Sequence, residues 1–485
     1  MLDGILSLDR DLPVPLPEQV YRGLRGAIGE GRFSTGTRLP SSRALATSLG
    51  ISRNTVNAAY ELLAAEGVVS VRPGSAPRVA EHGGLRPEGS AGEDGVQKIA
   101  LSRRGRVMSA DPWGKSGRRR GGRLEPGSPA LDCFPKDAWA QTLRRAARNV
   151  RGRMMFYEET AGYPALRDAL ADYLTQDRGV RVTPGRVLVM PSTQASLQLV
   201  AQCLADPGDA AWIEDPGYLG ARAAFRSAGL SVQPMPVDGQ GADPSPLADG
   251  PSPKLIYVTP SHQYPHGMRM TLERRAMILD AARAHGAVVL EDDYDSEFLF
   301  SGRPLAAMQG LGADGEVIYL GTFSKSMLPG VRVAYMVVPE YLAGPLATAQ
   351  RVSGMLASVV TQAALADFIV SGRYRAHLKR IQGIYQARGA ALAGALRARL
   401  GGLASVADPV GGVQLALRFR DPVDDLEVAR RVNQLGFGVA SLSSYGIRCR
   451  QSGLVIGFAG LAEGDADDCA LAIAGALEEG GLDKT

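Results

Sequence analysis

Short apolar runs alternate with alanine-rich helical patterns from Leu131 onward, and this alternation limits the possible folds more than any other feature. Six runs have the length and apolarity of buried strands, at residues 186–190, 210–214, 254–259, 287–291, 317–321 and 333–338. Helical patterns separate several of them, at residues 193–205, 219–228 and 272–285. Strands that alternate with helices predict an α/β domain with a mostly parallel sheet. From about Gly389, helices mix with short strands at 413–419 and 454–458, which predicts a smaller α+β lobe.

The 485 residues exceed what one hydrophobic core usually spans, so we expect more than one domain. We divide the chain into residues 1–80, 81–130 and 131–485. The middle zone is dense in Gly, Arg, Ser, Glu and Pro, which predicts a flexible linker because such a sequence buries little apolar surface. Its Arg118-Arg119-Arg120 run is either a solvated linker charge or a contact to DNA backbone.

The compartment follows from what the sequence lacks. No run approaches the roughly 18 apolar residues that cross a bilayer, and the first residues are acidic where a signal peptide is basic. We therefore expect a cytoplasmic protein. The four cysteines are far apart without CxxC spacing, which favours isolated reduced thiols over a zinc site or disulfides; they are Cys133, Cys203, Cys449 and Cys469.

The first zone has the pattern of a small DNA-binding domain. Helical patterns are expected at residues 18–30, 43–49 and 53–66, with Gly50 ending the second and Ser52 capping the third. Two short helices joined by a tight glycine turn predict a helix-turn-helix. The following hairpin, with Arg72 and Gly74 at its tip, would be a wing.

The third helix of this zone begins with side chains suited to reading bases. In a helix-turn-helix the N-terminal residues of the second helix of the pair enter the major groove. Here they are short hydrogen-bonding side chains and an arginine, namely Ser52, Arg53, Asn54, Thr55 and Asn57. The charge distribution agrees, because residues 1–80 carry a net charge of +2 and residues 81–130 of +4, out of +4 for the whole chain.

The run RLPSSRALATSLGISRNTVNAAYELLAAEGVV resembles the GntR-type winged helix-turn-helix along its whole length. The resemblance implies that Gly74 lies at the wing tip and that DNA is contacted by Arg43, Ser52, Arg53, Asn54 and Asn57. The wing departs from the family pattern, because Ala76-Pro77 stands where Gly-Thr is expected.

Chemistry-bearing residues follow the strands of the large domain. Asp292 lies just past the strand at 287–291, where α/β folds place ligands, and Tyr294 comes next. After the strand at 317–321 come Thr322, Ser324 and Lys325, with Arg332 beyond. Upstream, a strand joins a helix through Ser192, Thr193 and Gln194, and Tyr218 follows another strand.

This set matches the demands of pyridoxal 5'-phosphate. Lys325 would form the Schiff base, Asp292 would hold the pyridine nitrogen protonated, and Tyr294 would bond the ring oxygen. Tyr218 would stack on the ring. The phosphate would be held by Arg332, by the hydroxyls near Lys325 and by free N–H groups at the helix that begins after Ser192.

Two other interpretations of the acidic cluster stay open. Glu291, Asp292, Asp293 and Asp295 could bind a hard cation, but no nearby histidine or second acidic cluster completes a site, so we expect no metal. Asp293 could also replace Asp292 as the partner of the pyridine nitrogen.

The segments YEETAGYPALRDAL, EDPGYLGARAA, VTPSHQYPHGMRM, LEDDYDSEF and YLGTFSKSMLPGVRVAY resemble the MocR subfamily of GntR regulators, from about Leu16 to the end apart from the linker. The resemblance implies a fold-type I aminotransferase-like domain that binds pyridoxal phosphate through Lys325, with the roles of Asp292, Tyr294 and Tyr218 as above. It also implies a homodimer whose DNA-binding domains pack on the partner's large domain. An amine or amino acid that exchanges with Lys325 would then modulate binding to a DNA operator.

Two departures argue against a dedicated enzyme. Working aminotransferases carry Asn-Pro-Thr-Gly where this chain has Tyr264-Pro265-His266-Gly267, and they carry a carboxylate-binding arginine where residues 452–460 read SGLVIGFAG. Arg448 and Arg450, in the preceding loop, are the candidates for effector binding, and His262 and His266 either line the pocket or are structural. Two alternatives remain: a sensor of pyridoxal phosphate itself that controls vitamin B6 metabolism, and an active aminotransferase with an appended DNA-binding domain.

Overall fold

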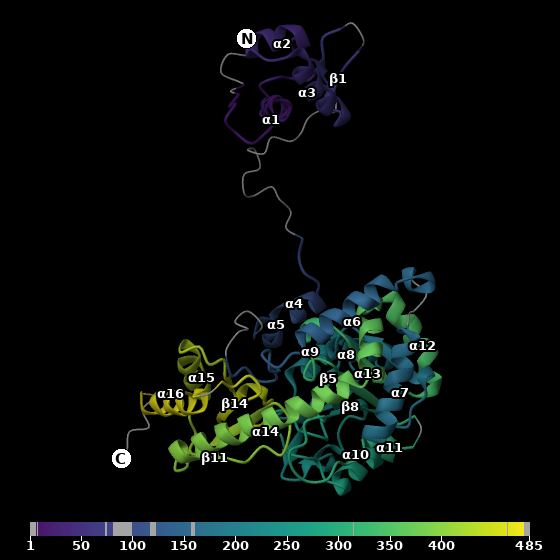
Figure 1. Ribbon diagram of the computed structural model, residues 1–485, viewed down its shortest axis with the longest axis vertical. Helices are drawn as coiled ribbons and strands as arrows, with labels where there is room; N and C mark the ends of the chain where they lie inside the picture. The colour runs from purple at the N-terminus through teal and green to yellow at the C-terminus, as the bar shows by residue number, and fades with distance from the viewer. Residues whose placement is uncertain are drawn as a thin grey trace. The chain divides into compact units, whose positions relative to one another are not determined.

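The computed structural model describes residues 6, 8–72, 75–80, 99–116, 123–156, 161–313, 315–462 and 464–479. The chain divides into two units, Met1–Ala100 and Leu101–Thr485, both drawn in Figure 1.

The first unit is a winged helix-turn-helix, as predicted. Its elements are α1 (Leu16–Gly29), α2 (Ser42–Leu49), α3 (Arg53–Ala65) and the antiparallel pair β1 (Val69–Ser70) and β2 (Arg78–Val79). Ser41 and Ser52 accept hydrogen bonds from backbone N–H groups at the starts of α2 and α3. Gly50 ends α2 in the left-handed region, at φ 64°. Val20, Leu24 and other fully buried apolar side chains from all three helices form its core.

The second unit is built on an eight-stranded, mostly parallel sheet, also as predicted. The strand order is β3-β10-β9-β8-β7-β4-β5-β6. Strands β10 and β6 are antiparallel to their neighbours, and the other pairs are parallel. The bounds are β3 (Val187–Met190), β4 (Ala210–Asp215), β5 (Ser231–Asp238), β6 (Gly241–Ala242), β7 (Pro253–Val258), β8 (Val288–Asp293), β9 (Val317–Thr322) and β10 (Ala334–Val337).

Helices cover both faces of this sheet (Figure 1). One face packs against α8 (Thr193–Leu204), α9 (Leu219–Ala228) and α12 (Glu340–Val352), through side chains such as Leu290 and Leu320. We call this the α9 face. The opposite face packs against α7 (Pro164–Arg178), α10 (Leu272–His285), α11 (Met308–Leu311) and α13 (Val359–Val370). Helix α6 (Lys136–Arg148) lies against α13. Apolar side chains on both strand faces explain the unbroken apolar runs in the sequence.

A smaller lobe follows the long helix α14 (Arg373–Leu400) and confirms the predicted α+β region. Its antiparallel sheet has the order β11-β12-β14-β13, with the bounds Ala404–Val406, Gln414–Phe419, Gly453–Gly457 and Ala440–Ser441. Helices α15 (Asp425–Gln434) and α16 (Asp465–Glu479) complete the lobe, and the short helix η6 (Ser443–Tyr445) follows β13. Its apolar side chains belong to the same core cluster as α7, α13 and α14.

Two described stretches of the segment 81–130 differ from the expected flexible linker. Residues Arg103–Ala110 and Pro112–Ser116 form helices α4 and α5, and both lie against α9 (Figure 1). Residues 123–130 pack into the large unit, where Leu124 is 1% exposed and its N–H donates to the carbonyl of Phe437. The average composition of these 50 residues does not show that short stretches within them pack against the larger unit. Residues 81–98 and 117–122, with the Arg118-Arg119-Arg120 run, lie outside the described residues.

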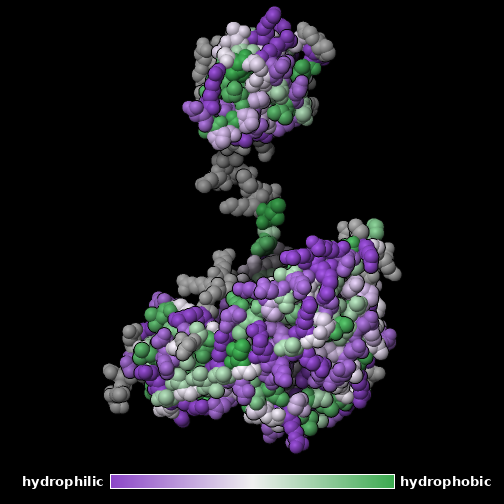
Figure 2. All heavy atoms as spheres, viewed as in Figure 1, coloured by the Kyte–Doolittle hydropathy of each residue, from purple (hydrophilic) through white to green (hydrophobic). Residues whose placement is uncertain are grey.

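The face of the larger unit seen in Figure 2 carries mostly hydrophilic side chains, with apolar ones scattered between them. Within the described ranges, no helix combines the length and hydropathy that a membrane span requires.

Candidate cofactor site and nucleic-acid interface

The register of the central sheet brings the predicted phosphate-binding residues to one edge. Ala334, at the start of β10, pairs with Met190 at the end of β3 and with Thr322 at the end of β9. Ser192 and Ser324 each lie two residues beyond those strand ends, and Arg332 lies two residues before Ala334. The carboxyl ends of β8, β7 and β4 reach the same edge, because these strands run parallel to β9.

Side chains at this edge are held in place by local hydrogen bonds. The Ser192 hydroxyl accepts from the N–H of Ala195 at 3.1 Å and so caps α8, whose first residue is Thr193. The Gln194 side chain donates to the carbonyl of Gly220 at 3.1 Å. Thr322 and Ser324 are joined through their hydroxyls at 3.0 Å. The arrangement presents N–H groups and hydroxyls, which suits an anion.

Arg332 has the one non-glycine backbone of positive φ in the described chain, at 54°. It follows the short helix η5 (Pro329–Val331) in the left-handed region. Such a conformation is costly for a residue with a Cβ, and it is typical of positions that a function fixes.

Asp292 lies on the α9 face at the end of β8 and is 4% exposed. The Tyr257 hydroxyl donates to its Oδ2 at 2.7 Å, and Oδ1 has no hydrogen-bond partner among the described residues. Burial, with a smaller contribution from the charge of Asp293, raises the pKa of Asp292 from 3.8 to about 7. The Lys325 ammonium acts in the opposite direction on this pKa, so the two groups lie within electrostatic range.

Lys325 follows β9 and points to the segment that precedes α6. Its Nζ donates to the carbonyl oxygen of Gly127 at 2.6 Å. Gly127 has φ +74°, and a Cβ added there would lie 3.0 Å from the lysine Nζ. The backbone conformation therefore favours glycine at this position, and an added Cβ would displace the lysine Nζ by a few tenths of an ångström.

Tyrosines form a cluster beside Asp292. Tyr218, the residue before α9, stacks on Tyr257 with 6.4 Å between ring centroids and 29° between planes. Tyr264 meets the ring of Tyr218 edge-on at 5.5 Å and the ring of Tyr294 at 5.8 Å. Burial raises the pKa of the Tyr294 hydroxyl well above 10, so this group stays a hydrogen-bond donor at neutral pH. The predicted stacking and ring-oxygen residues thus lie close together.

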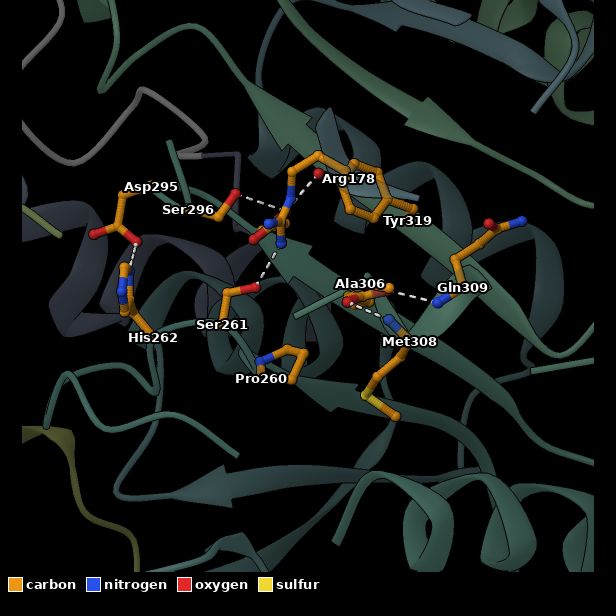
Figure 3. A network of polar contacts seen from close by, with 12 residues as sticks. Arg178, Pro260, Ser261, His262, Asp295, Ser296, Ala306, Met308, Gln309 and Tyr319 are labelled. Atoms are coloured by element: carbon orange, nitrogen blue, oxygen red, sulfur yellow. Dashed lines mark hydrogen bonds and ion pairs between the residues drawn. The ribbon is translucent and has the colours of Figure 1, made fainter. Parts of the chain in front are cut away.

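Asp293, the alternative partner of the pyridine nitrogen, is engaged on the opposite face of β8. Its Oδ2 accepts from Arg178 at 2.8 Å, from Ser296 at 2.8 Å and from Tyr319 at 2.5 Å. Figure 3 shows Arg178 among Tyr319, Ser296 and Ser261. The Arg178 guanidinium holds the pKa of Asp293 below its ordinary value despite burial. Geometry therefore favours Asp292 over Asp293 for the α9 face.

The other two acids of the cluster have partners of their own. Glu291 accepts from the backbone N–H groups of Met308 and Gln309, at 2.8 and 2.9 Å. Asp295 pairs with Nδ1 of His262 at 2.8 Å, and both side chains are buried (Figure 3). Throughout the part of the chain that the structure describes, no three His, Cys, Asp or Glu side chains are grouped to hold a metal ion.

The candidate effector residues Arg448 and Arg450 are exposed, in the loop between η6 and β14. Strand β14 itself contains no arginine, as its sequence shows. His266 is half-buried, and burial lowers its pKa from 6.5 to about 4, so it is neutral at physiological pH.

Most of the candidate DNA-reading residues lie at the start of α3, while Arg43 lies on α2 and Arg72 follows β1. Arg43, Arg53, Asn54 and Arg72 are exposed, whereas Thr55 and Asn57 are half-buried. Arg53 is oriented by a hydrogen bond from its Nε to the hydroxyl of Ser42, at 3.3 Å. The Ser52 hydroxyl accepts from the N–H of Thr55 at 3.1 Å, so it caps the helix. Gly74 lies outside the described residues.

Tyr257, Gly127 and Asp215 are site residues that the sequence did not single out. Tyr257 reads as one more apolar residue of a strand, and Gly127 falls in the segment expected to be a linker. Asp215 directly follows the strand predicted at 210–214, and nothing in that segment distinguishes it from a solvated residue at a strand end. Their contacts join parts of the chain that are far apart in sequence, so no local pattern could have indicated them.

Comparison with known proteins identifies both units. The family of bacterial regulatory proteins described as gntR matches residues 16–79, and the family aminotransferase class I and II matches residues 128–469. The probable rhizopine catabolism regulatory protein MocR of Rhizobium meliloti is 39% identical over 463 residues, which span 94% of this chain and 92% of that protein.

The chain belongs to the MocR-type transcriptional regulators.

Other members of this regulator group match over the same length. The pyridoxine biosynthesis regulator PdxR of Corynebacterium glutamicum is 30% identical, over 94% of this chain and 95% of that protein. Among solved structures, a kynurenine aminotransferase of Pyrococcus horikoshii has a TM-score of 0.68 at 25% identity, covering 73% of this chain and 90% of that one. The MocR-type chain is therefore a DNA-binding regulator that joins a GntR helix-turn-helix to a fold-type I aminotransferase-like domain.

Proposed function

We propose that this MocR-type regulator binds pyridoxal phosphate at Lys325, and that an amine or amino acid bound at the same site changes its affinity for an operator. The observation that carries the proposal is the buried Oδ1 of Asp292, which has no hydrogen-bond partner among the described residues. A buried carboxylate oxygen without a partner is costly. The N–H of a protonated pyridine ring would satisfy it, so the residues present fit the cofactor.

Each side chain of the site has a definite task. Bound to the protein, pyridoxal phosphate supplies an aldehyde that bonds reversibly to primary amines. Asp292 would hold the proton on the ring nitrogen, with its second oxygen fixed by Tyr257. Tyr218 would stack on the ring, and the Tyr294 hydroxyl would donate to the ring oxygen. The Gly127 carbonyl orients Nζ of Lys325.

The phosphate would lie at the edge where β3, β9 and β10 meet. The N-terminus of α8 presents backbone N–H groups of Thr193 and Gln194 beside the Ser192 hydroxyl. Thr322 and Ser324 add hydroxyls. Arg332, held in its unusual backbone conformation, would supply the positive charge and two parallel hydrogen bonds.

The effector would be an amine or amino acid. Arg448 and Arg450 are the candidates to bind its acidic group, because both are exposed in a loop whose backbone is hydrogen-bonded to Asp215 at the carboxyl end of β4. With Tyr264 where enzymes of this fold carry asparagine, we infer that sensing rather than turnover is the main task. The relative MocR is named for rhizopine catabolism, and TauR of Rhodobacter capsulatus, 32% identical over 74% of this chain, is a regulator as well.

We also propose a cytoplasmic homodimer that binds double-stranded DNA. The exposed start of α3, with Arg53 and Asn54, would enter the major groove. Two copies would read two half-sites, so that the spacing of the half-sites reports the geometry of the dimer.

A second candidate is a sensor of pyridoxal phosphate itself. The similarity to PdxR, which is named as a regulator of pyridoxine biosynthesis, favours it. In this case the cofactor is the effector, and no amine is needed.

The visible absorption spectrum of the purified protein, before and after pyridoxal phosphate is added, tests the proposal. We expect a band that Lys325→Ala abolishes and that Lys136→Ala, an exposed lysine at the start of α6, leaves intact. Titration with D-alanine, GABA and taurine should then shift the band. If no amine shifts it but pyridoxal phosphate changes operator affinity, the second candidate holds. If the loaded wild type shows no band, the cofactor assignment is wrong.

A further inference from the structure

The loop that carries Arg448 and Arg450 is fastened to the large sheet by one carboxylate. Asp215, the last residue of β4, is 5% exposed. Its two oxygens accept from the backbone N–H groups of Ile447, Arg448 and Cys449, at 2.7, 2.8 and 3.0 Å. Three charge-assisted hydrogen bonds to consecutive amides fix the path of that backbone.

Further contacts tie the same loop to the junction between β4 and α9. The N–H of Gly217 donates to the carbonyl of Tyr445 at 3.2 Å. Arg222, on α9, donates to the carbonyl of Gly446 at 3.4 Å. Tyr218, the residue expected to cover the cofactor ring, lies between Gly217 and the start of α9. A movement of the loop or of the Tyr218 ring would therefore displace the first turns of α9.

The same helix also holds the segment that leads in sequence to the DNA-binding unit. Helices α4 and α5 lie against α9. Asp111, between them, accepts from the N–H of Trp113 at 3.0 Å through Oδ1 and faces Arg226 of α9 at 3.8 Å through Oδ2. Only 10% of the Asp111 side chain is exposed, so this ion pair is partly shielded from water.

Arg222 bonds the loop at Gly446 and lies on the same helix as Arg226. It lies one helical turn before Arg226, on the same side of α9. Burial lowers the pKa of Arg222, while the carboxylates of Asp111 and Asp215 both act to raise it. The Arg222 guanidinium therefore lies within electrostatic range of both Asp111 and Asp215.

We propose that α9 couples the loop that carries Arg448 and Arg450 to the linker helices α4 and α5: Asp215 and Arg222 hold the loop against the start of α9, and the ion pair of Arg226 with Asp111 passes its position to α4 and α5. This inference rests on the proposed function, because it assumes that a ligand at the cofactor site moves the loop or Tyr218. Helix α9 has ten residues and is about 15 Å long, so we expect it to move as one rigid body and to carry a displacement from its first turn to Arg226.

The experiment compares Asp111→Asn with Asp249→Asn, a matched change in the exposed loop before β7. The full chain is loaded with pyridoxal phosphate, and the probe is whichever of D-alanine, GABA and taurine shifts the absorption band most. If none does, pyridoxal phosphate itself is the probe, and the chain is compared before and after it is loaded. Affinity for the probe is measured by absorption, and operator affinity by fluorescence anisotropy with and without the probe, on a duplex selected by the wild type.

We expect Asp111→Asn to keep the wild-type probe affinity within about 2-fold and to lose most of the probe-induced change in operator affinity, which is typically about 5- to 150-fold. Arg226→Gln, on a half-exposed side chain, should do the same. Asp215→Asn should weaken probe binding about 10-fold and leave the lysine-bound absorption band in place. Full coupling in Asp111→Asn and Arg226→Gln would overturn the inference. A missing band in the wild type would instead overturn the proposed function.

Discussion

Asp292 and Asp293 are neighbours in sequence, but their carboxyl groups lie on opposite faces of β8 and have pKa values shifted in opposite directions. Asp292 meets Tyr257 on the α9 face, and burial raises its pKa to about 7. Asp293 meets Arg178 on the other face, and the guanidinium lowers its pKa. The two-residue period of a strand therefore separates the proposed cofactor-binding carboxylate from one that pairs with Arg178.

Substitution of each aspartate should separate these tasks. Asp293→Asn leaves the buried Arg178 without a counter-charge, so we expect a loss of about 3–5 kcal/mol in the free energy of unfolding. Asp292→Asn keeps an acceptor for Tyr257, so we expect a loss under about 1 kcal/mol and a large loss of cofactor affinity. Urea unfolding and absorption titration measure the two effects. Equal destabilisation by both changes would contradict the separation.

Glu297 should make the large unit less stable as the pH rises. Burial, with a smaller effect of Asp293, raises the pKa of Glu297 from 4.5 to about 8, and its Oε2 has no partner among the described residues. Between pH 4.5 and pH 8 the folded chain keeps a proton on Glu297 that the unfolded chain releases. The stability that the protonated Glu297 contributes is therefore complete below pH 4.5 and is lost as the pH rises towards 8.

Glu297→Gln removes this loss. We expect the variant to gain about 3 kcal/mol over the wild type at pH 8, relative to the difference at pH 5. The measurement is urea unfolding at both pH values. Asp249→Asn, in an exposed loop, serves as the control. A constant difference between variant and wild type across this range would show that Glu297 does not titrate there.

Gly127→Ala should disturb Lys325 directly. The substitution places a Cβ 3.0 Å from Nζ, in a backbone of φ +74°. Gly372 has the same φ with nothing within 4 Å of an added Cβ, so Gly372→Ala is a matched control for backbone strain. We expect both to lose about 1–2 kcal/mol of stability. Only Gly127→Ala should change the absorption band of the lysine-bound cofactor. An unchanged band would exclude a role for Gly127 in orienting the lysine.

Ser52 both caps α3 and faces the expected DNA surface, and two substitutions separate these roles. Ser52→Ala removes the cap and should cost about 1 kcal/mol of stability. Ser52→Asp keeps the cap but adds a negative charge near phosphates, so stability should stay while DNA affinity falls by about 10-fold or more. Thermal unfolding and anisotropy on a selected duplex measure both. If Ser52→Asp binds DNA as the wild type does, the start of α3 does not lie near the phosphate backbone.

Element types and positions could be predicted well where local patterns determine them. The predicted helices at 219–228 and 272–285 match α9 and α10 at both ends. Strand β8 continues two residues past its predicted end, because Asp292 and Asp293 find partners on both faces. Acidic residues are normally taken to end a strand, and only tertiary contacts allow them to extend it.

The linker and the cofactor site were less predictable for the same reason. Leu124 packs against the small lobe, more than 300 residues away in sequence, and Gly127 meets Lys325 from the same short segment. The resemblance to a family supplied the lysine, the aspartate and the tyrosines. It did not indicate Asp215 or Asp111. The fold brings three backbone N–H groups to Asp215 and the Arg226 guanidinium to Asp111, and only these contacts point to their proposed roles.

The three hydrogen bonds that Asp215 accepts from residues 447–449 also affect the kinetics of ligand binding. Because this carboxylate already joins the two lobes of the large unit, the site is preorganised, and little binding energy is needed to assemble it. The observed rate of the first, non-covalent binding step should therefore rise in proportion to effector concentration, without the plateau that a slow closing step before it imposes. Differences in affinity among effectors would then arise mainly from their rates of dissociation.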